Sequence, residues 1–165
     1  SPTWSPDGQR IAFLSYPPLG LNSGSSTSIL VIPENGSKQL TNGPGRDEDP
    51  SWSPDSRHIV FSSNRLGGCS DLFIINVDDG LLRQLTPAES CGVQPAWSPD
   101  GAMIAYVAPT TKELVIYLVR PDGTEARPLI SGTDPDWAPI SYVTSAREIS
   151  WGVIKVRSQL NLHYP

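Results

Sequence analysis

The chain has 165 residues and a formal net charge of −5, from 17 acidic and 12 basic residues. This balance argues against nucleic acid as the main partner, because phosphate binding needs clustered lysine and arginine. No run of 18 or more apolar residues is present, so the sequence predicts no membrane-spanning helix. The chain opens inside its first motif, at Ser1-Pro2-Thr3-Trp4, without a recognisable leader, and we interpret it as a mature, processed or truncated product.

A tryptophan motif recurs along the chain. Trp4-Ser5-Pro6-Asp7-Gly8 returns at 52–56 and 97–101 and, in shortened form, at 137–139. The tryptophans are 48, 45 and 40 residues apart, which matches the length of a four-stranded propeller blade. A proline lies two positions before each tryptophan: Pro2, Pro50, Pro95 and Pro135.

Each unit predicts four strands in the same order. The first strand carries the tryptophan, and the Pro-Asp-Gly turn after it favours a tight hairpin. An apolar second strand follows at 11–13, 59–61 and 104–106, and a third at 29–32, 72–75 and 114–117. A glycine-containing turn then leads into a short fourth strand at 39–41, 84–86 and 127–130. Ser56 replaces the glycine of the first turn in the second unit, so that turn must accept serine.

The motif residues are interpreted as structural. We expect the tryptophans to pack between neighbouring blades rather than to stack on a ligand: Trp4, Trp52, Trp97 and Trp137. The turn aspartates are expected to accept backbone N–H bonds within their own turns: Asp7, Asp55 and Asp100.

The Trp-Ser-Pro-Asp-Gly-x-x-Ile-Ala-Phe pattern with its Leu-Thr ending resembles the WD-like propeller repeat of the TolB family, over about residues 1–139. The resemblance implies a ring of usually about six blades, a periplasmic or extracellular location, and a role as a protein-interaction platform. Related repeats occur in prolyl-oligopeptidase-like peptidases, where the propeller gates a separate catalytic domain.

The predicted fold is therefore an all-β propeller of four-stranded antiparallel blades. Three full blades are expected at about 1–41, 50–86 and 95–130, with the inner strand of a further blade at 135–139. Such an incomplete ring exposes sheet edges and blade faces. Three explanations stay open: a fragment of a longer propeller, a dimer that closes one ring, or a filament, of which we favour the first two.

Residues 140–165 leave the repeat. They are predicted to form a C-terminal extension that caps the last blade or docks on a partner, because the segment is too apolar for a solvated linker. Within it, residues 148–157 fit either a short helix capped by Ser150 or a strand, which the β-branched Val153, Ile154 and Val156 favour equally.

Acidic residues stand before two of the repeat prolines, where the chain enters an inner strand at the mouth of the central channel. The candidate metal ligands are Asp47, Asp49 and Asp134, because converging carboxylates suit Ca²⁺. The same groups would suit a basic partner peptide, or they are solvated loop charges. The equivalent segment at 90–94 supplies no carboxylate, which weakens the metal hypothesis.

Two cysteines are placed by the predicted topology. Cys69 lies between the second and third strands of the second unit, and Cys91 lies in the loop that leaves this unit. These loops lie at the same end of a four-stranded meander, so we expect a disulfide between the two cysteines. It would close a loop of about twenty residues and stabilise the folded state by about 3 kcal/mol on the chain-entropy model. A disulfide would imply that the protein is located in an oxidising compartment. The alternative is that both cysteines are free buried thiols.

No catalytic residue is predicted. The sequence lacks a nucleophile elbow and a phosphate-binding loop, and His58 and His163 lack metal-ligand spacing. The leading hypothesis is a non-catalytic, extracytoplasmic propeller, periplasmic, secreted or at the cell surface, that binds a protein partner or other copies of itself. One alternative is a propeller segment of a larger prolyl-oligopeptidase-like hydrolase. Another is a cation- or glycan-binding propeller, with Ca²⁺ as its cofactor.

Overall fold

The computed structural model describes residues 2–16, 27–32, 36–138 and 153–157, and every regular element among them is a strand. The first sheet contains β1 (Thr3–Trp4), β2 (Ile11–Ser15), β3 (Ser28–Ile32) and β4 (Lys38–Gln39). The second contains β5 (Asp47–Trp52), β6 (His58–Ser63), β7 (Asp71–Asn76) and β8 (Leu82–Gln84). The third contains β9 (Val93–Trp97), β10 (Ile104–Pro109), β11 (Leu114–Val119) and β12 (Arg127–Ser131). A fourth, two-stranded sheet contains β13 (Thr133–Ala138) and β14 (Val153–Arg157).

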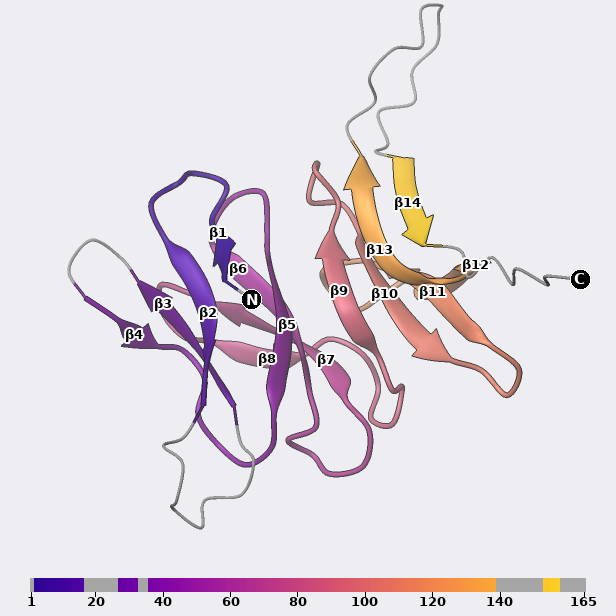
Figure 1. The fold of residues 1–165 in the computed structure, drawn as a ribbon, viewed down its shortest axis with the longest axis horizontal. Coiled ribbons are helices and arrows are strands. Elements are labelled where there is room, and N and C mark those ends of the chain that lie inside the picture. Colours follow the sequence, from indigo (N-terminus) through magenta and orange to yellow (C-terminus); the bar gives the residue numbers. More distant parts are fainter. Residues whose placement is uncertain (1, 17–26, 33–35, 139–152, 158–165) are drawn as a thin grey trace, which may run out of the picture.

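Each of the first three sheets is an antiparallel meander in which neighbours along the chain are neighbours in the sheet. The sheets follow one another across the molecule, and the first strands of the sheets lie side by side (Figure 1). The predicted all-β propeller with three full blades and a partial fourth is therefore confirmed, and we call the sheets blades one to four.

The segment that was ambiguous between helix and strand contains strand β14. This strand pairs antiparallel with β13, with Trp137 opposite Ile154 and Ala138 opposite Val153. The same relationship joins Trp4 to Ile11 in blade one and Trp52 to Ile59 in blade two. Part of the predicted C-terminal extension thus continues the fourth blade, while the rest of 140–165 lies outside the described residues.

The tryptophan motif forms the same turn in blades one to three. In each turn, the main-chain N–H of the fourth residue donates a hydrogen bond to the main-chain carbonyl of the serine that follows the tryptophan. The three donors are Gly8, Ser56 and Gly101, and each bond is 2.9 Å long. Ser56 takes the left-handed conformation with φ of 59°. Its hydroxyl accepts a hydrogen bond from the Asp7 main-chain N–H at 3.1 Å, which joins blade two to blade one.

The turn aspartates behave as expected. Asp100 accepts bonds from the Ser98 hydroxyl at 2.6 Å and the Ala102 N–H at 3.0 Å, and Asp7 and Asp55 make equivalent contacts. The bond from Ser98 is the main cause that holds the pKa of Asp100 below its ordinary value, and that from Ser5 does the same for the pKa of Asp7. At Asp55 burial raises the pKa, but the hydrogen bonds outweigh it and the pKa is lowered.

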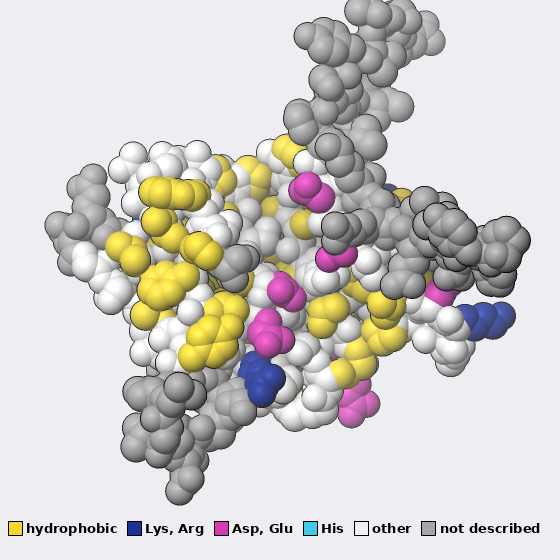
Figure 2. All heavy atoms as spheres, viewed as in Figure 1, with side chains coloured by type: hydrophobic (Ala, Val, Ile, Leu, Met, Phe, Trp, Pro, Cys, Tyr) yellow, Lys and Arg dark blue, Asp and Glu magenta, His cyan; other side chains and the backbone are white. Residues whose placement is uncertain are grey.

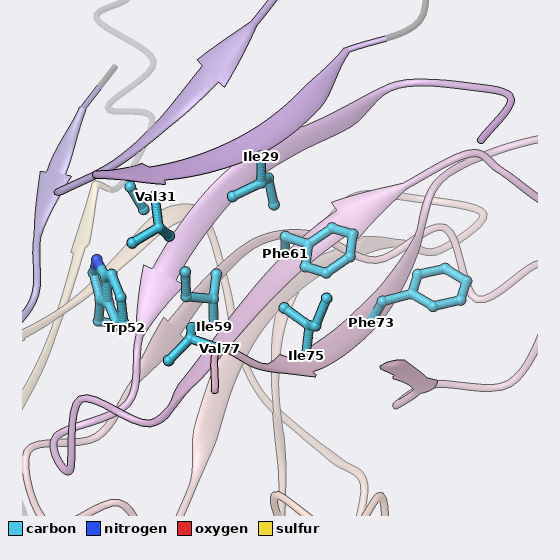
Figure 3. Close-up of a cluster of buried hydrophobic side chains, with 9 residues drawn as sticks. Ile29, Val31, Trp52, Ile59, Phe61, Phe73, Ile75 and Val77 are labelled. Atoms are coloured by element: carbon cyan, nitrogen blue, oxygen red, sulfur yellow. The ribbon is translucent and has the colours of Figure 1, made fainter. Parts of the chain in front are cut away.

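Apolar clusters fill the junctions between blades. The junction of blades one and two contains aliphatic side chains of blade one and aromatic side chains of blade two (Figure 3), among them Ala12, Ile29, Val31, Trp52, Phe61 and Phe73. The next junction contains Val60, Leu72, Leu85, Ile104 and Tyr106. In the third, Trp137 packs against Met103, Ala105, Val107, Ile116 and Leu118 of blade three.

The tryptophans mark these junctions. Trp52 is buried and its indole N–H donates to the Thr3 carbonyl of blade one at 3.2 Å. Trp137 donates in the same way to the Ala96 carbonyl of blade three at 3.1 Å. Trp97 packs into the second junction, but its buried indole N–H has no acceptor among the residues that the structure describes. Trp4 departs from the expectation and is 64% exposed, because no described segment covers that side of blade one.

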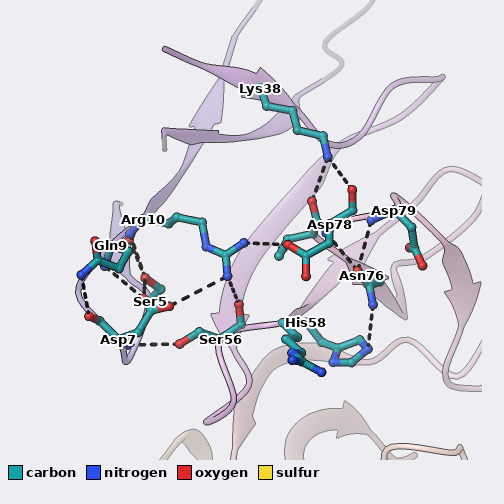
Figure 4. Close-up of polar contacts among 12 residues, drawn as sticks. Ser5, Asp7, Gln9, Arg10, Lys38, Ser56, His58, Asn76, Asp78 and Asp79 are labelled. Atoms are coloured by element: carbon teal, nitrogen blue, oxygen red, sulfur yellow. Dashed lines mark hydrogen bonds and ion pairs between the residues drawn. The ribbon is translucent and has the colours of Figure 1, made fainter. Parts of the chain in front are cut away.

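Basic side chains add a polar clamp at the outer part of the first junction (Figure 4). Arg10 pairs with Asp78 at 3.1 Å and donates to the Ser56 carbonyl at 2.6 Å. Lys38 donates to the Val77 carbonyl at 2.8 Å. Arg83 of blade two repeats this contact by donating to the Pro121 carbonyl of blade three. Side chains of one blade thus hold the turn between the third and fourth strands of the next.

Candidate functional site

The first strands of blades two, three and four share a bulge immediately before a proline. The register with the neighbouring strand shifts between Glu48 and Ser51 in β5, and equivalent shifts occur in β9 and β13. The residue at each bulge takes the left-handed conformation, with φ of 52° at Asp49, 54° at Gln94 and 52° at Asp134. Bulges of this kind redirect a side chain out of the strand pattern. The acidic residues expected in loops therefore lie inside strands.

The three bulge residues are joined by hydrogen bonds across the blades. The Gln94 side-chain amide donates to the Asp134 carboxylate at 2.9 Å, and the Asp134 main-chain N–H donates back to the side-chain oxygen Oε1 of Gln94 at 3.2 Å. The Gln94 main-chain N–H donates to the Asp49 carboxylate at 3.3 Å. All three residues are partly or fully exposed. We call Asp49, Gln94 and Asp134 the bulge row.

The bulge row presents two exposed carboxylates, those of Asp49 and Asp134. Figure 2 shows acidic side chains gathered along the middle of the face in view, beside an apolar area over blade one. The bulge row is exposed, and its two carboxylates have more acceptor positions than these hydrogen bonds use. The carboxylates can therefore accept hydrogen bonds from a bound molecule or form ion pairs with its cationic groups.

Asp47 does not belong to this row. Its side chain is buried and forms an ion pair with Arg65 at 2.7 Å, and it accepts a bond from the Ser63 hydroxyl at 2.6 Å. The Arg65 guanidinium in turn lies over the rings of Phe61 and Phe73, at 5.3 and 4.9 Å from their centroids. The Asp47 charge is thus neutralised within blade two, and the residue acts in the packing of that blade.

The sequence hypothesis of a Ca²⁺ site drew on Asp47, Asp49 and Asp134 together. The structure places only Asp49 and Asp134 in contact with a common residue, Gln94. Within the part of the chain that the structure describes, no group of three or more His, Cys, Asp or Glu side chains is placed to hold a metal ion. Cation binding at Asp49 and Asp134 stays a prediction.

A disulfide fixes the loop that leads into β9. Cys69 and Cys91 are joined, with their Cα atoms 5.1 Å apart. Buried Asp71 holds the same loop by accepting bonds from the Glu89 N–H at 3.1 Å and the Ser90 N–H at 2.9 Å. The loop is therefore fastened to blade two just before the chain reaches Gln94.

Sequence reasoning missed two of these residues. Gln94 is uncharged and therefore gives no metal-ligand signal in the sequence, although its place before Pro95 matches those of Asp49 and Asp134 before their prolines. Comparison of the pre-proline positions across the units would have found it. Arg65 gave no such signal, because its pairing with Asp47 depends on how β5 and β6 lie together.

A family model described as the TolB beta propeller domain matches residues 1–144. The chain belongs to this family. It is 38% identical over 88 residues to the uncharacterized peptidase YuxL of Bacillus subtilis, a match that covers 52% of this chain and 13% of that protein. It is 36% identical over 67 residues to the Tol-Pal system protein TolB of Alcanivorax borkumensis, with 41% and 15% covered.

Solved structures show the same fold. TolB from Acinetobacter baumannii superposes with a TM-score of 0.65 at 23% identity, over 84% of this chain and 34% of that chain. This TolB-family chain thus spans less than half the length of the curated relatives and solved structures it matches. The described residues contain no helix that is long and apolar enough to cross a membrane.

Proposed function

We propose that this TolB-family propeller is a non-catalytic, extracytoplasmic module that binds other proteins through the bulge row. The observation that carries the proposal is the hydrogen-bonded row of Asp49, Gln94 and Asp134, which repeats one exposed polar position across three blades. Charge-assisted hydrogen bonds to carboxylates favour a basic peptide segment as the bound group. The Cys69–Cys91 disulfide supports a location in an oxidising compartment.

Peptide titration tests this function. Fluorescence anisotropy would compare the binding of labelled lysine- and arginine-rich peptides with that of glutamate-rich peptides of the same length. We expect only the basic peptides to bind, and we expect added salt to weaken binding because the contact is exposed.

A double variant, Asp49→Asn with Asp134→Asn, should weaken binding of the basic peptides by roughly tenfold or more. The matched control is Asp79→Asn with Asp122→Asn, which removes the same charge from turns between third and fourth strands. An equal loss of peptide affinity in both double variants would show that only the net charge of the protein matters, and it would contradict a site at the bulge row. Absence of binding to every basic peptide would contradict the proposal directly.

A second candidate function is the propeller of a larger hydrolase. The similarity to the peptidase YuxL over 88 residues favours it, and this chain covers only 13% of that protein. The complete coding sequence distinguishes the two candidates. An α/β-hydrolase domain in the same reading frame would support the hydrolase, and a complete reading frame without one would exclude it.

A further inference from the structure

The loop between β8 and β9, residues 85–92, holds two residues other than glycine in the left-handed backbone conformation. Glu89 has a φ of 63° and Cys91 a φ of 55°. In this conformation the Cβ atom crowds the following carbonyl oxygen, so each residue raises the energy of the folded loop. Such residues persist only where neighbouring groups hold them, and they are common in binding and switch segments. The loop therefore carries backbone strain, and it ends two residues before Gln94 of the bulge row.

The corresponding loop of blade one, residues 40–46 before β5, uses glycine instead. Its left-handed residues are Gly43, with a φ of 125°, and Gly45, with a φ of 93°. Glycine adopts these angles without a steric penalty. All of residues 40–46 are described, and none of them is a cysteine. Backbone strain and a covalent cross-link therefore occur together in the loop that leads to Gln94.

Two interactions hold the loop 85–92 in its strained form. The Cys69–Cys91 disulfide joins it to the loop between β6 and β7. The buried Asp71 carboxylate accepts hydrogen bonds from the Glu89 N–H and from both the N–H and the hydroxyl of Ser90. Asp71 therefore fixes the first strained residue, and the disulfide fixes the second.

Gly92 connects Cys91 to the bulge row. A Cβ atom at Gly92 would lie 3.1 Å from the Tyr106 ring and 3.2 Å from Leu72, so the chain is closely packed at this point. A backbone change at Cys91 therefore cannot be absorbed at Gly92, and it displaces the start of β9, which carries Gln94.

We propose that the Cys69–Cys91 disulfide is a redox-sensitive switch. The oxidised form holds Gln94 in the bulge row, and reduction releases Gln94 and weakens binding there. This regulation rests on the proposed function of the bulge row. The disulfide stays closed in an oxidising compartment, so the binding form is the default state. A protein dithiol opens it by reaching the two cysteines, which are both partly exposed.

The switching step is a thiol–disulfide exchange with this dithiol reductant. A thiolate of the reductant attacks the sulfur of Cys69 or Cys91, and the bond between these two sulfurs breaks. The second thiol of the reductant then displaces the attacked sulfur and closes the reductant's own disulfide. Two electrons and two protons pass to the protein, which gains two thiols, and the reductant loses the same number. Cys91 then leaves the left-handed conformation, and Gln94 loses its bonds to Asp49 and Asp134.

Amide resonances of the unaltered chain test the switch, because Cys69 and Cys91 are its only cysteines and give a reductant one target. Dithiothreitol should shift the resonance of the Asp134 main-chain N–H, which donates to Gln94 from the neighbouring blade. It should leave the resonances of β2 and β3 in blade one unchanged. An Asp134 resonance that does not move on reduction would overturn the proposal, and so would general unfolding of all blades.

Peptide affinity measures the regulation. In fluorescence anisotropy, reduction should raise the dissociation constant of a lysine- and arginine-rich peptide by about tenfold. If the oxidised chain binds no basic peptide, the proposed function fails, while the Asp134 resonance still shows whether the disulfide holds Gln94. If the peptide affinity is the same in both redox states, the switch is contradicted and the proposed function stands.

Two double variants separate backbone strain from loss of the cross-link. Cys69→Ser with Cys91→Ser imitates the reduced chain and should bind the peptide about tenfold more weakly than the oxidised protein. Cys69→Ser with Cys91→Gly also lacks the cross-link, but glycine accepts a φ of 55° without strain, so about threefold of this affinity should return. Neither variant should respond to dithiothreitol, which makes both of them controls for the reagent. Equal affinities in the two variants would contradict strain at Cys91 as the cause.

Discussion

Gln94 and Asp134 hold each other through two opposed hydrogen bonds, at 2.9 Å from the glutamine amide to the carboxylate and at 3.2 Å from the aspartate N–H to the glutamine oxygen. The two residues occupy the same bulge position in neighbouring blades. The uncharged Gln94 thus stands between the carboxylates of Asp49 and Asp134, and it donates to Asp134 from its side-chain amide and to Asp49 from its main-chain N–H. These bonds from Gln94 link three blades.

The first prediction concerns Gln94→Glu. This change replaces the amide donor by a third carboxylate, so repulsion should lower the unfolding temperature in the presence of a chelator. Ca²⁺ prefers clustered carboxylate oxygens, so adding it should raise the unfolding temperature of the variant more than that of the original protein. Thermal unfolding with chelator and with Ca²⁺ measures both effects.

Gln84→Glu is the matched control, because Gln84 is an exposed glutamine in the outer strand β8. It should show no response to Ca²⁺ beyond that of the original protein. The original protein also tests the prediction of Ca²⁺ binding at Asp49 and Asp134. An unfolding temperature that is the same with and without chelator would contradict a structural ion there.

The second prediction compares two tryptophans. Trp52→Phe removes the indole donor to the Thr3 carbonyl and leaves a gap in the junction of blades one and two, which should cost about 2 kcal/mol of unfolding free energy. Trp97→Phe creates a similar gap but removes a buried N–H that finds no acceptor in the described part of the chain. It should therefore cost about 1 kcal/mol less. Urea unfolding of both variants measures the difference, and equal losses would show that the indole hydrogen bond adds nothing.

The third prediction concerns the disulfide. Its cysteines are 22 residues apart, so replacing both by serine should lower the unfolding free energy by about 3 kcal/mol on the chain-entropy model. A reducing agent should destabilise the original protein by a similar amount and leave the double-serine variant unchanged. Calorimetry with and without reductant measures this. A drop in the double variant on reduction would show that the reagent acts elsewhere.

The repeat made the blades predictable, because the same local pattern specifies the same strands wherever it occurs. Trp52 and Trp137 pack where the pattern placed them, and Ser56 accepts the left-handed turn conformation that glycine fills in the other copies. The exposure of Trp4 was not predictable from the motif, because burial depends on a neighbouring blade rather than on the tryptophan itself.

The candidate site was predictable only in part. The prolines indicated where the inner strands begin, but not that a bulge keeps Asp47 and Glu48 paired with β6. The bulge turns Asp49 toward Gln94, while Asp47 stays inside blade two with Arg65, 18 residues further along the chain. Such side-chain partners follow from strand register, which composition and spacing do not contain.

The last prediction concerns the turn aspartates in acid. The folded-state pKa of Asp100 lies below its ordinary value of 3.8, chiefly because of the bond from Ser98. A lowered pKa stabilises the folded state fully above the unfolded-state pKa, and this stabilisation is lost as the pH falls through the folded-state value. The difference in unfolding free energy between the original protein and Asp100→Asn should therefore narrow as the pH is lowered from about 5 toward 2.

Ser98→Ala separates the hydrogen bond from the charge. Ser98 is buried, and its hydroxyl both donates to Asp100 and accepts from the Met103 N–H at 2.9 Å. Its loss should cost about 1–3 kcal/mol at neutral pH, and in its absence Asp100→Asn should have a smaller effect that varies less with pH. Urea unfolding of the two single variants and the double variant at several pH values measures the coupling. If the difference in unfolding free energy between the original protein and Asp100→Asn stays constant from neutral to acid pH, the Asp100 charge does not stabilise the turn.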